Sequence, residues 1–315
     1  MIERHVIIDN VDPVVFYGVN NCNIQLIRNL FPKLRMAARG NVIKVIGDEE
    51  ETALFEQKVK ELADFCNHYN QLNEEVIIDT IKGTPPKELK MDDAIIFGVN
   101  GKPIKARTPN QQLLVKTFTE NDLTFALGPA GTGKTYLAVA MAVRALKNRE
   151  VRKIILSRPA VEAGEKLGFL PGDMKDKIDP YLQPLYDALG DMIPIRKLQE
   201  FMADGTIQIA PLAYMRGRTL DRACVILDEA QNTNLGQLKM FLTRMGANAK
   251  FIVTGDASQV DLPNKKDSGL IRGINLIKDL KGVSVISFTN EDIVRHPLVT
   301  KIVKAFDKAE PESEE

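Results

Sequence analysis

The sequence predicts an α/β fold in which a parallel sheet carries helices on both faces, preceded by a small α+β domain. From Thr108 onward, short apolar runs alternate with helical stretches, which is typical of parallel strands joined by crossover helices. A glycine-rich segment at 128–135 lies between an apolar run and a helical stretch. This is the position of a phosphate-binding loop, so the larger domain is predicted to be a P-loop domain.

Length and composition set the limits of the prediction. The chain has 315 residues, enough for an α/β domain of roughly 200 residues and a smaller one. Lys+Arg and Asp+Glu both total 42, so net charge does not predict a nucleic-acid binder, although a local basic face is not excluded. We find no signal peptide and no apolar run of the ~18 residues that cross a bilayer, and the three cysteines are scattered. We therefore expect a cytoplasmic protein without a membrane partner.

Residues 1–83 are expected to form the small α+β domain. Its predicted segments are a strand at 5–9, a helix at 24–31, hairpin strands at 33–38 and 42–46, and a helix over 55–69. Four hairpin residues, Lys33, Arg35, Arg39 and Lys44, form a candidate RNA-binding face or an ordinary solvated surface. A Gly-x-x-Gly loop of the KH type is not expected, because Val-Asn-Asn follows Gly18.

Residues 84–107 are expected to form a linker with a hairpin at Asn100-Gly101. The P-loop domain then covers 108–306, and a disordered acidic tail covers 307–315. Six strands are predicted in the P-loop domain, at 123–127, 153–157, 207–210, 224–227, 251–254 and 283–288.

The glycine-rich segment predicts an ATP site with Mg²⁺. It consists of Gly128, Pro129, Ala130, Gly131, Thr132, Gly133, Lys134 and Thr135. The glycines allow several backbone N–H groups to approach the phosphates together, where Cβ atoms would block the approach. Lys134 can reach the β- and γ-phosphate oxygens, and the Thr135 hydroxyl can bind the metal.

Two strand ends supply further candidates. The predicted strand at 224–227 runs into Asp228, a second metal contact, and Glu229, a base for the attacking water. Alone, such a pair is equally typical of a charged surface, but beside a P-loop it indicates hydrolysis. Gln259 follows the strand at 251–254 and can sense the γ-phosphate, or can belong to a plain turn.

Several blocks closely resemble the PhoH family over about 104–306. They include GPAGTGKTYLAVA, SRPAVEAGEKLGFLPGDMKDKIDPYLQPLYDAL, PLAYMRGRTL, ILDEAQNT, FLTRMG, VTGDASQVDLP and VRHP. The family is similar to the first RecA-like domain of superfamily 1 helicases. That likeness implies that Gln111 contacts the adenine edge and that Gln259 belongs to the γ-phosphate sensor; Arg158 would fall near the nucleic-acid path. For Gln111, a solvated glutamine at a helix start is the alternative.

The same likeness implies an active site shared between subunits. Superfamily 1 helicases take an arginine from a second RecA-like domain, and the 27 residues after 288 are too few to form one. We therefore expect a homo-oligomer, or a contribution from the C-terminal piece. Arg295 is the leading candidate, with Arg244, Arg216 and Arg218 as rivals and a local ion pair as its alternative role. His296 has no ligand partner at metal spacing.

The expected function is Mg-dependent ATP hydrolysis coupled to RNA binding, remodelling or processing, with an endoribonuclease as a candidate partner. The RNA link comes from the resemblance alone. Two alternatives are a nucleotide-gated adaptor and a small-molecule phosphotransferase. Glu229 favours water as the acceptor, which argues against the phosphotransferase.

Overall fold

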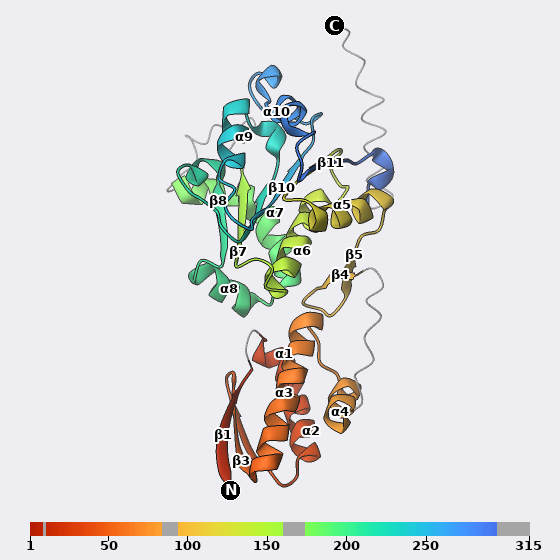
Figure 1. The fold of residues 1–315 in the computed structure, drawn as a ribbon, viewed down its shortest axis with the longest axis vertical. Coiled ribbons are helices and arrows are strands. Elements are labelled where there is room, and N and C mark those ends of the chain that lie inside the picture. The colour runs from red at the N-terminus through yellow and green to blue at the C-terminus, as the bar shows by residue number, and fades with distance from the viewer. Residues whose placement is uncertain (9–10, 84–93, 160–173, 295–315) are drawn as a thin grey trace.

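The structure is a computed structural model that describes residues 1–8, 11–83, 94–159 and 174–294. Figure 1 shows two bodies, a small N-terminal module and a larger sheet domain. The predicted linker at 84–93 and the tail at 307–315 lie outside the described residues. Within the described part of the chain, we find no helix long and apolar enough to cross a membrane.

The N-terminal module is a three-stranded antiparallel sheet with helices on one face. Its elements are β1 (Ile2–Ile7), α1 (Pro13–Tyr17), α2 (Cys22–Leu30), β2 (Arg35–Arg39), β3 (Val42–Gly47), α3 (Glu49–Tyr69) and α4 (Glu74–Lys82). The strand order is β1-β3-β2, so β3 lies in the middle. Its core includes Val6, Ile27, Ile43 and Phe55. The predicted strands, helices and hairpin are present, but α1 and α4 were not predicted and the first strand ends at Ile7 rather than at residue 9.

The α1 helix has only five residues, too few to show a periodic pattern, but its start is well marked. Asp12 caps it by accepting from the Val14 N–H, and Pro13 occupies the first turn, where the missing N–H costs nothing.

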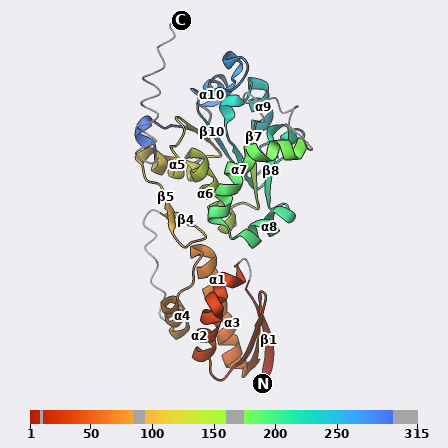
Figure 2. The same ribbon diagram turned by 180° about the vertical axis from the view of Figure 1, so that it is seen from behind.

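A hairpin lies between the two bodies. Strands β4 (Ala94–Phe97) and β5 (Pro103–Lys105) pair antiparallel, as predicted. Both ribbon views show this hairpin at the junction (Figures 1 and 2). Helix α5 (Pro109–Glu120) then leads into the main sheet.

The main sheet has six parallel strands in the order β11-β6-β10-β9-β7-β8. They are β6 (Leu123–Leu127), β7 (Lys153–Arg158), β8 (Ile207–Pro211), β9 (Ala223–Leu227), β10 (Lys250–Gly255) and β11 (Val283–Ser287). All six predicted strands are confirmed, with each end within one residue of the prediction. The central strands β6, β9 and β10 are rich in apolar residues because a sheet covered on both faces buries the side chains on both sides of these strands.

Helices cover both faces, as the alternation predicted. On one face, Ile154 and Ile226 pack with residues of α5, α6 (Lys134–Lys147), α7 (Met174–Met192) and α8 (Ile195–Ala203). On the other face, Ile155 and Val225 pack with residues of α9 (Leu235–Leu242) and α10 (Leu270–Ile277). Consecutive strand residues therefore enter opposite cores.

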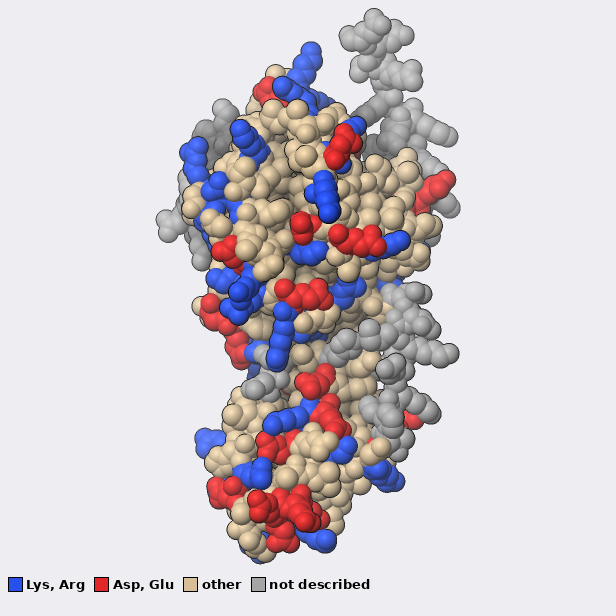
Figure 3. Space-filling view, viewed as in Figure 1, with Lys and Arg blue, Asp and Glu red and all other residues tan. Residues whose placement is uncertain are grey.

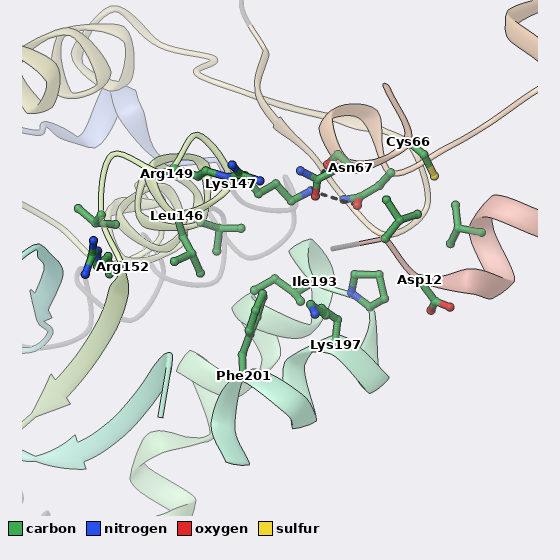
Figure 4. Close-up of a pocket in the computed structure, with 16 residues that line it drawn as sticks. Asp12, Cys66, Asn67, Leu146, Lys147, Arg149, Arg152, Ile193, Lys197 and Phe201 are labelled. Carbon is green, nitrogen blue, oxygen red and sulfur yellow. Dashed lines mark hydrogen bonds between the residues drawn. The ribbon is translucent and has the colours of Figure 1, made fainter. Parts of the chain in front are cut away.

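One asparagine joins the two bodies. Asn70 follows α3 in the left-handed conformation (φ 51°), and its Nδ2 donates to Phe97 O (2.6 Å) and Met192 O (3.3 Å). Its Oδ1 accepts from Lys147 Nζ, the last residue of α6, at 3.0 Å. Lys147 Nζ also donates to Asn67 O at 3.0 Å, beside a cavity of about 440 Å³ between the bodies (Figure 4). The N-terminal module is therefore tied to the far end of the helix that begins at the phosphate-binding loop.

Candidate nucleotide-binding site

The glycine-rich loop connects β6 to α6 at the carboxyl edge of the sheet. Gly128, Gly131 and Gly133 have φ angles of 138°, 82° and 80°, a region that side chains with a Cβ rarely adopt. A Cβ at Gly128 would lie 2.4 Å from Phe288 O, so any larger residue here would require the backbone to shift. The following helix begins at Lys134 and directs the positive end of its dipole toward the loop.

Lys134 lies over its own loop. Its Nζ donates to Gly128 O at 2.6 Å, to Pro129 O at 2.7 Å and to Thr132 Oγ1 at 3.3 Å. These neutral acceptors hold the ammonium group at the mouth of the loop. Phosphate oxygens are stronger, charged acceptors for the same three donors.

The carboxylate of Asp228 lies beside the loop, close to two threonine hydroxyl groups. Its side chain is buried, and its Oδ1 accepts from Thr135 Oγ1 at 2.7 Å and from Thr254 Oγ1 at 2.6 Å. Strands β9 and β10 are neighbours in the sheet, which brings Asp228 and Thr254 together. A hydroxyl and a carboxylate oxygen are ligands that Mg²⁺ prefers, so the residues present fit this metal.

Glu229, which follows Asp228, has an unusual backbone conformation. Its φ of 53° is a left-handed conformation that is uncommon for residues other than glycine. Arg158 Nη2 lies 2.9 Å from Glu229 Oε1, and Gln231 Nε2 donates to Glu229 Oε2. Both carboxylate oxygens are therefore oriented by neighbouring side chains, and such local strain is often found at functional sites.

Arg158 occupies the site from the neighbouring strand. It ends β7, and its Nη1 donates to Tyr181 O of α7 at 2.8 Å. Its Nε lies 3.9 Å from Asp228 Oδ2. From the sequence we assigned this arginine only to the nucleic-acid path and sought the completing arginine elsewhere. The structure places Arg158 among the carboxylates of its own nucleotide site.

Gln231 is a site residue that the sequence analysis missed. It is fully buried, and besides Glu229 it contacts Gln259 O through Nε2 (3.1 Å) and the Asp256 N–H through Oε1 (3.0 Å). It therefore connects the ends of β9 and β10. A polar residue two positions after the acidic pair was the available signal, but only the fold shows that it is buried.

These side chains share one cavity of about 500 Å³. Six of its lining residues are Lys134, Thr135, Arg158, Asp228, Glu229 and Gln259. The structure thus brings Arg158 together with the residues that the sequence assigned to phosphate, metal and water, from four different strand ends and loops.

Gln111 lies on the other side of the loop. It is only 3% exposed, so the alternative of a solvated helix-start glutamine is wrong. Its Nε2 donates to Thr132 O at 3.0 Å, and its Oε1 accepts from the Arg107 N–H at 2.6 Å. With Arg107 and Tyr136 it lines a further cavity of about 810 Å³ beside the loop.

The other candidate arginines are not found at this site. Arg244 Nη1 donates to Arg218 O at 3.1 Å, and Arg218 Nη2 donates to Gln208 Oε1 at 2.6 Å. Neither they nor Arg216 line the cavity that contains Lys134. Arg295 and His296 lie outside the described residues.

The sheet, the loop and the acidic pair define a P-loop nucleoside triphosphatase. A family model described as "PhoH-like protein" matches residues 103–307. PhoH-like proteins of Bacillus subtilis and Synechocystis sp. are 50% and 44% identical to this chain; the alignments cover 87% and 88% of the chain and 88% and 86% of those proteins. The chain belongs to the PhoH-like family.

Further matches cover about two thirds of this chain. Protein PhoH of Escherichia coli is 43% identical over 65% of this chain and 58% of its own length. Two matching solved structures are the large terminase of a thermophilic bacteriophage (TM-score 0.40, 11% identity, 65% of this chain and 51% of that chain) and the Pif1 helicase of Candida albicans (TM-score 0.34, 14% identity, 65% and 44%).

Proposed function

We propose that this protein hydrolyses ATP with Mg²⁺ and couples hydrolysis to RNA binding or remodelling in the cytoplasm. The observation that carries the hydrolytic part is the placement of Glu229 in the same cavity as Lys134, Thr135 and Asp228. This arrangement offers a carboxylate base beside the position that a γ-phosphate would occupy.

Each part of the site has a proposed role. The loop from Gly128 to Thr135 binds the phosphates through its N–H groups, and Lys134 exchanges its carbonyl acceptors for β- and γ-phosphate oxygens. Thr135 and Asp228 hold Mg²⁺, which neutralises charge on the phosphates when bound.

The remaining roles concern water and the base of the nucleotide. Glu229 orients and deprotonates the attacking water, and Gln259 senses the γ-phosphate from the end of β10. Gln111 couples the loop to the cavity in which we place the adenine, because its amide already contacts Thr132 O.

Arg158 is a further candidate for stabilising charge on the transferred phosphate within one subunit. It is already at the site and needs only to exchange Glu229 for a phosphate oxygen. Arg295 from an adjacent copy in a homo-oligomer stays the alternative source.

Measuring phosphate release with and without Mg²⁺, and with and without single-stranded RNA, tests this proposal. We expect metal-dependent hydrolysis that RNA accelerates. Hydrolysis without an RNA response would leave a simple ATPase. ATP binding without turnover would favour the nucleotide-gated adaptor, for example for an endoribonuclease. Transfer of phosphate to a small molecule would favour the phosphotransferase, which the base position of Glu229 argues against.

A further inference from the structure

The N-terminal module has a topology that the sequence alone did not reveal. Its first six elements follow the order β1-α1-α2-β2-β3-α3, and the last strand, β3, lies between the other two. This β-α-α-β-β-α arrangement with an antiparallel sheet is that of type I KH domains. In those domains, a Gly-x-x-Gly loop between the two first helices clamps the backbone of single-stranded RNA.

The loop between α1 and α2 is Gly18-Val19-Asn20-Asn21. We did not expect a KH-type loop here because its second glycine is missing. Gly18, Asn20 and Asn21 all have positive φ, at 76°, 54° and 61°. Asparagine readily adopts that conformation, and Asn21 stands in it at the position of the second glycine. The loop thus has the place of the KH loop in the order of elements, and three of its four residues have a positive φ.

Charge gives an independent reason. Residues 1–83 contain nine Lys/Arg and thirteen Asp/Glu, a difference of −4, so the module as a whole is acidic. Residues 13–47, however, contain five Lys/Arg and no Asp/Glu. This range holds α1, the loop, α2, β2 and β3. In Figure 3, acidic side chains gather at the free end of the module. The first turn of α3 consists of Glu49, Glu50 and Glu51. The elements that would contact RNA are therefore the ones that lack repelling carboxylates.

Three of the five basic residues have no acidic partner among the described residues. Lys44 Nζ pairs with Glu3 at 2.8 Å, and Lys33 Nζ pairs with Glu51 at 3.5 Å. Arg28 on α2 and Arg35 and Arg39 on β2 are exposed and make neither an ion pair nor a side-chain hydrogen bond with any residue that the structure describes. Uncommitted guanidinium groups of this kind suit phosphate oxygens.

A hydrogen bond connects the end of α1, next to the loop, with the turn that follows the edge strand β2. Tyr17 OH donates to Gly40 O at 2.9 Å, which ties the end of α1 to the β2–β3 turn. Strand β2 pairs only with β3 in the described chain, so its other edge offers free N–H and C=O groups. Val14 of α1 and Val19 of the loop are 55% and 80% exposed, and apolar groups there can contact bases.

We propose that residues 13–47 form a binding site for single-stranded RNA, in which the loop from Gly18 to Asn21 and α2 hold the backbone and the free edge of β2 faces the bases. This inference rests on the proposed function and specifies where its RNA is bound. The separation of basic from acidic residues and the three arginines without an acidic partner among the described residues support this site independently of the resemblance in fold.

The test uses the full chain and a fluorescein-labelled 12-nucleotide single-stranded RNA of mixed sequence, with fluorescence anisotropy as readout. The variant Val19→Asp/Asn20→Asp places two carboxylates in the loop at exposed positions, and aspartate tolerates the left-handed conformation of residue 20. We expect a loss of affinity of at least ~10-fold. The matched control, Leu54→Asp/Gln57→Asp, adds the same charge at exposed positions of α3 and should bind like the parent.

A second variant gives a readout that does not depend on the loop. Arg35→Ala/Arg39→Ala should reduce the slope of log K against log salt by about 1.4, the contribution of two phosphate contacts in a single strand. Thermal melting by circular dichroism checks folding, and basal ATP hydrolysis should be unchanged in all variants.

The outcomes separate this inference from the proposed function. If the parent binds RNA and both variants bind it equally well with an unchanged salt slope, the RNA site lies elsewhere and the inference is overturned, while the proposed function stands. If the parent binds no single-stranded RNA, the inference and the RNA part of the proposed function both fail, whatever the ATPase activity.

Discussion

Arg158 Nη2 lies 2.9 Å from Glu229 Oε1, so the carboxylate that we propose as the base forms an ion pair with an arginine of the same nucleotide site. In this arrangement Arg158 pairs with the carboxylate oxygen that would otherwise accept a proton from the attacking water. Binding of a nucleotide would offer Arg158 phosphate oxygens instead and release Glu229. In the proposed mechanism, the pair would link nucleotide binding to formation of the reactive arrangement.

Replacing Lys134 by alanine should abolish ATP binding. Lys134 is the cation that lies over the phosphate-binding loop, and its Nζ is within hydrogen-bonding distance of three loop oxygens. Isothermal titration calorimetry with ATP checks this, and Lys116→Ala on the exposed side of α5 is the control. ATP affinity equal to that of the parent would remove Lys134 from this role.

The variant Glu229→Gln should separate binding from turnover. The amide keeps the shape of the side chain but cannot accept the proton of water, so ATP should still bind while turnover falls by at least ~10²-fold. Phosphate release under saturating ATP is the measurement, with the exposed Glu120→Gln as a control. Near-normal turnover would assign the base to another group.

Arg158→Ala should lower turnover by at least ~10³-fold, the usual size of such an arginine's contribution, and change ATP affinity much less. The guanidinium contacts Tyr181 O, Glu229 and the edge of Asp228 together, through three different nitrogens. Arg158→Lys should not restore activity, because an ammonium group cannot span these positions. Steady-state kinetics on both variants, with exposed Arg152→Ala as control, provide the check. Full activity in Arg158→Lys would reduce the role of residue 158 to a simple positive charge.

Much of the fold and the site was predictable from local sequence patterns. The features that were not predictable are contacts between residues far apart in the sequence. The six main strands were predictable because each is a short run rich in apolar residues that alternates with helical stretches, and the loop because its glycines and Lys134 are fixed in spacing. The contact of Arg158 with Glu229 joins residues 71 positions apart on adjacent strand ends, which no spacing rule reveals. Burial of Gln231 and Gln111 likewise depends on neighbouring loops.

Removing the ammonium group of Lys147 should change how stability depends on pH. Desolvation lowers the pKa of Lys147 from 10.5 to about 8 in the folded protein. Between these values the unfolded chain binds more protons, so this group's contribution to the free energy of unfolding is greatest above pH 10.5 and falls as pH drops through 8. Cys66 beside it stays a neutral thiol at those pH values, because burial raises its pKa to about 12.

Lys147→Met should therefore lose this pH dependence. The free energy of unfolding of the parent should rise relative to that of the variant by up to about 3 kcal/mol between pH 7.5 and 10.5. Denaturant unfolding at several pH values gives this difference, and exposed Lys153→Met should follow the parent. A difference that stays constant with pH would show that Lys147 has an ordinary pKa.

Mixtures of two inactive variants should show whether the completing arginine comes from the same subunit. An arginine that stabilises charge on a transferred phosphate typically contributes ~10³–10⁵ in rate. If Arg295 acts across an interface, inactive Arg295→Ala chains mixed with Lys134→Ala chains should regain turnover, because some interfaces then join an intact loop to an intact arginine. If Arg158 acts within its own subunit, Arg158→Ala chains mixed with Lys134→Ala chains should stay inactive, since no subunit holds both groups. We expect the second mixture to remain inactive. Native mass measurement checks that the chains co-assemble. Recovery of turnover in the mixture of Arg158→Ala and Lys134→Ala chains would show that Arg158 acts at a neighbouring site. Failure of the mixture of Arg295→Ala and Lys134→Ala chains would show that Arg295 acts within its own subunit or not at all.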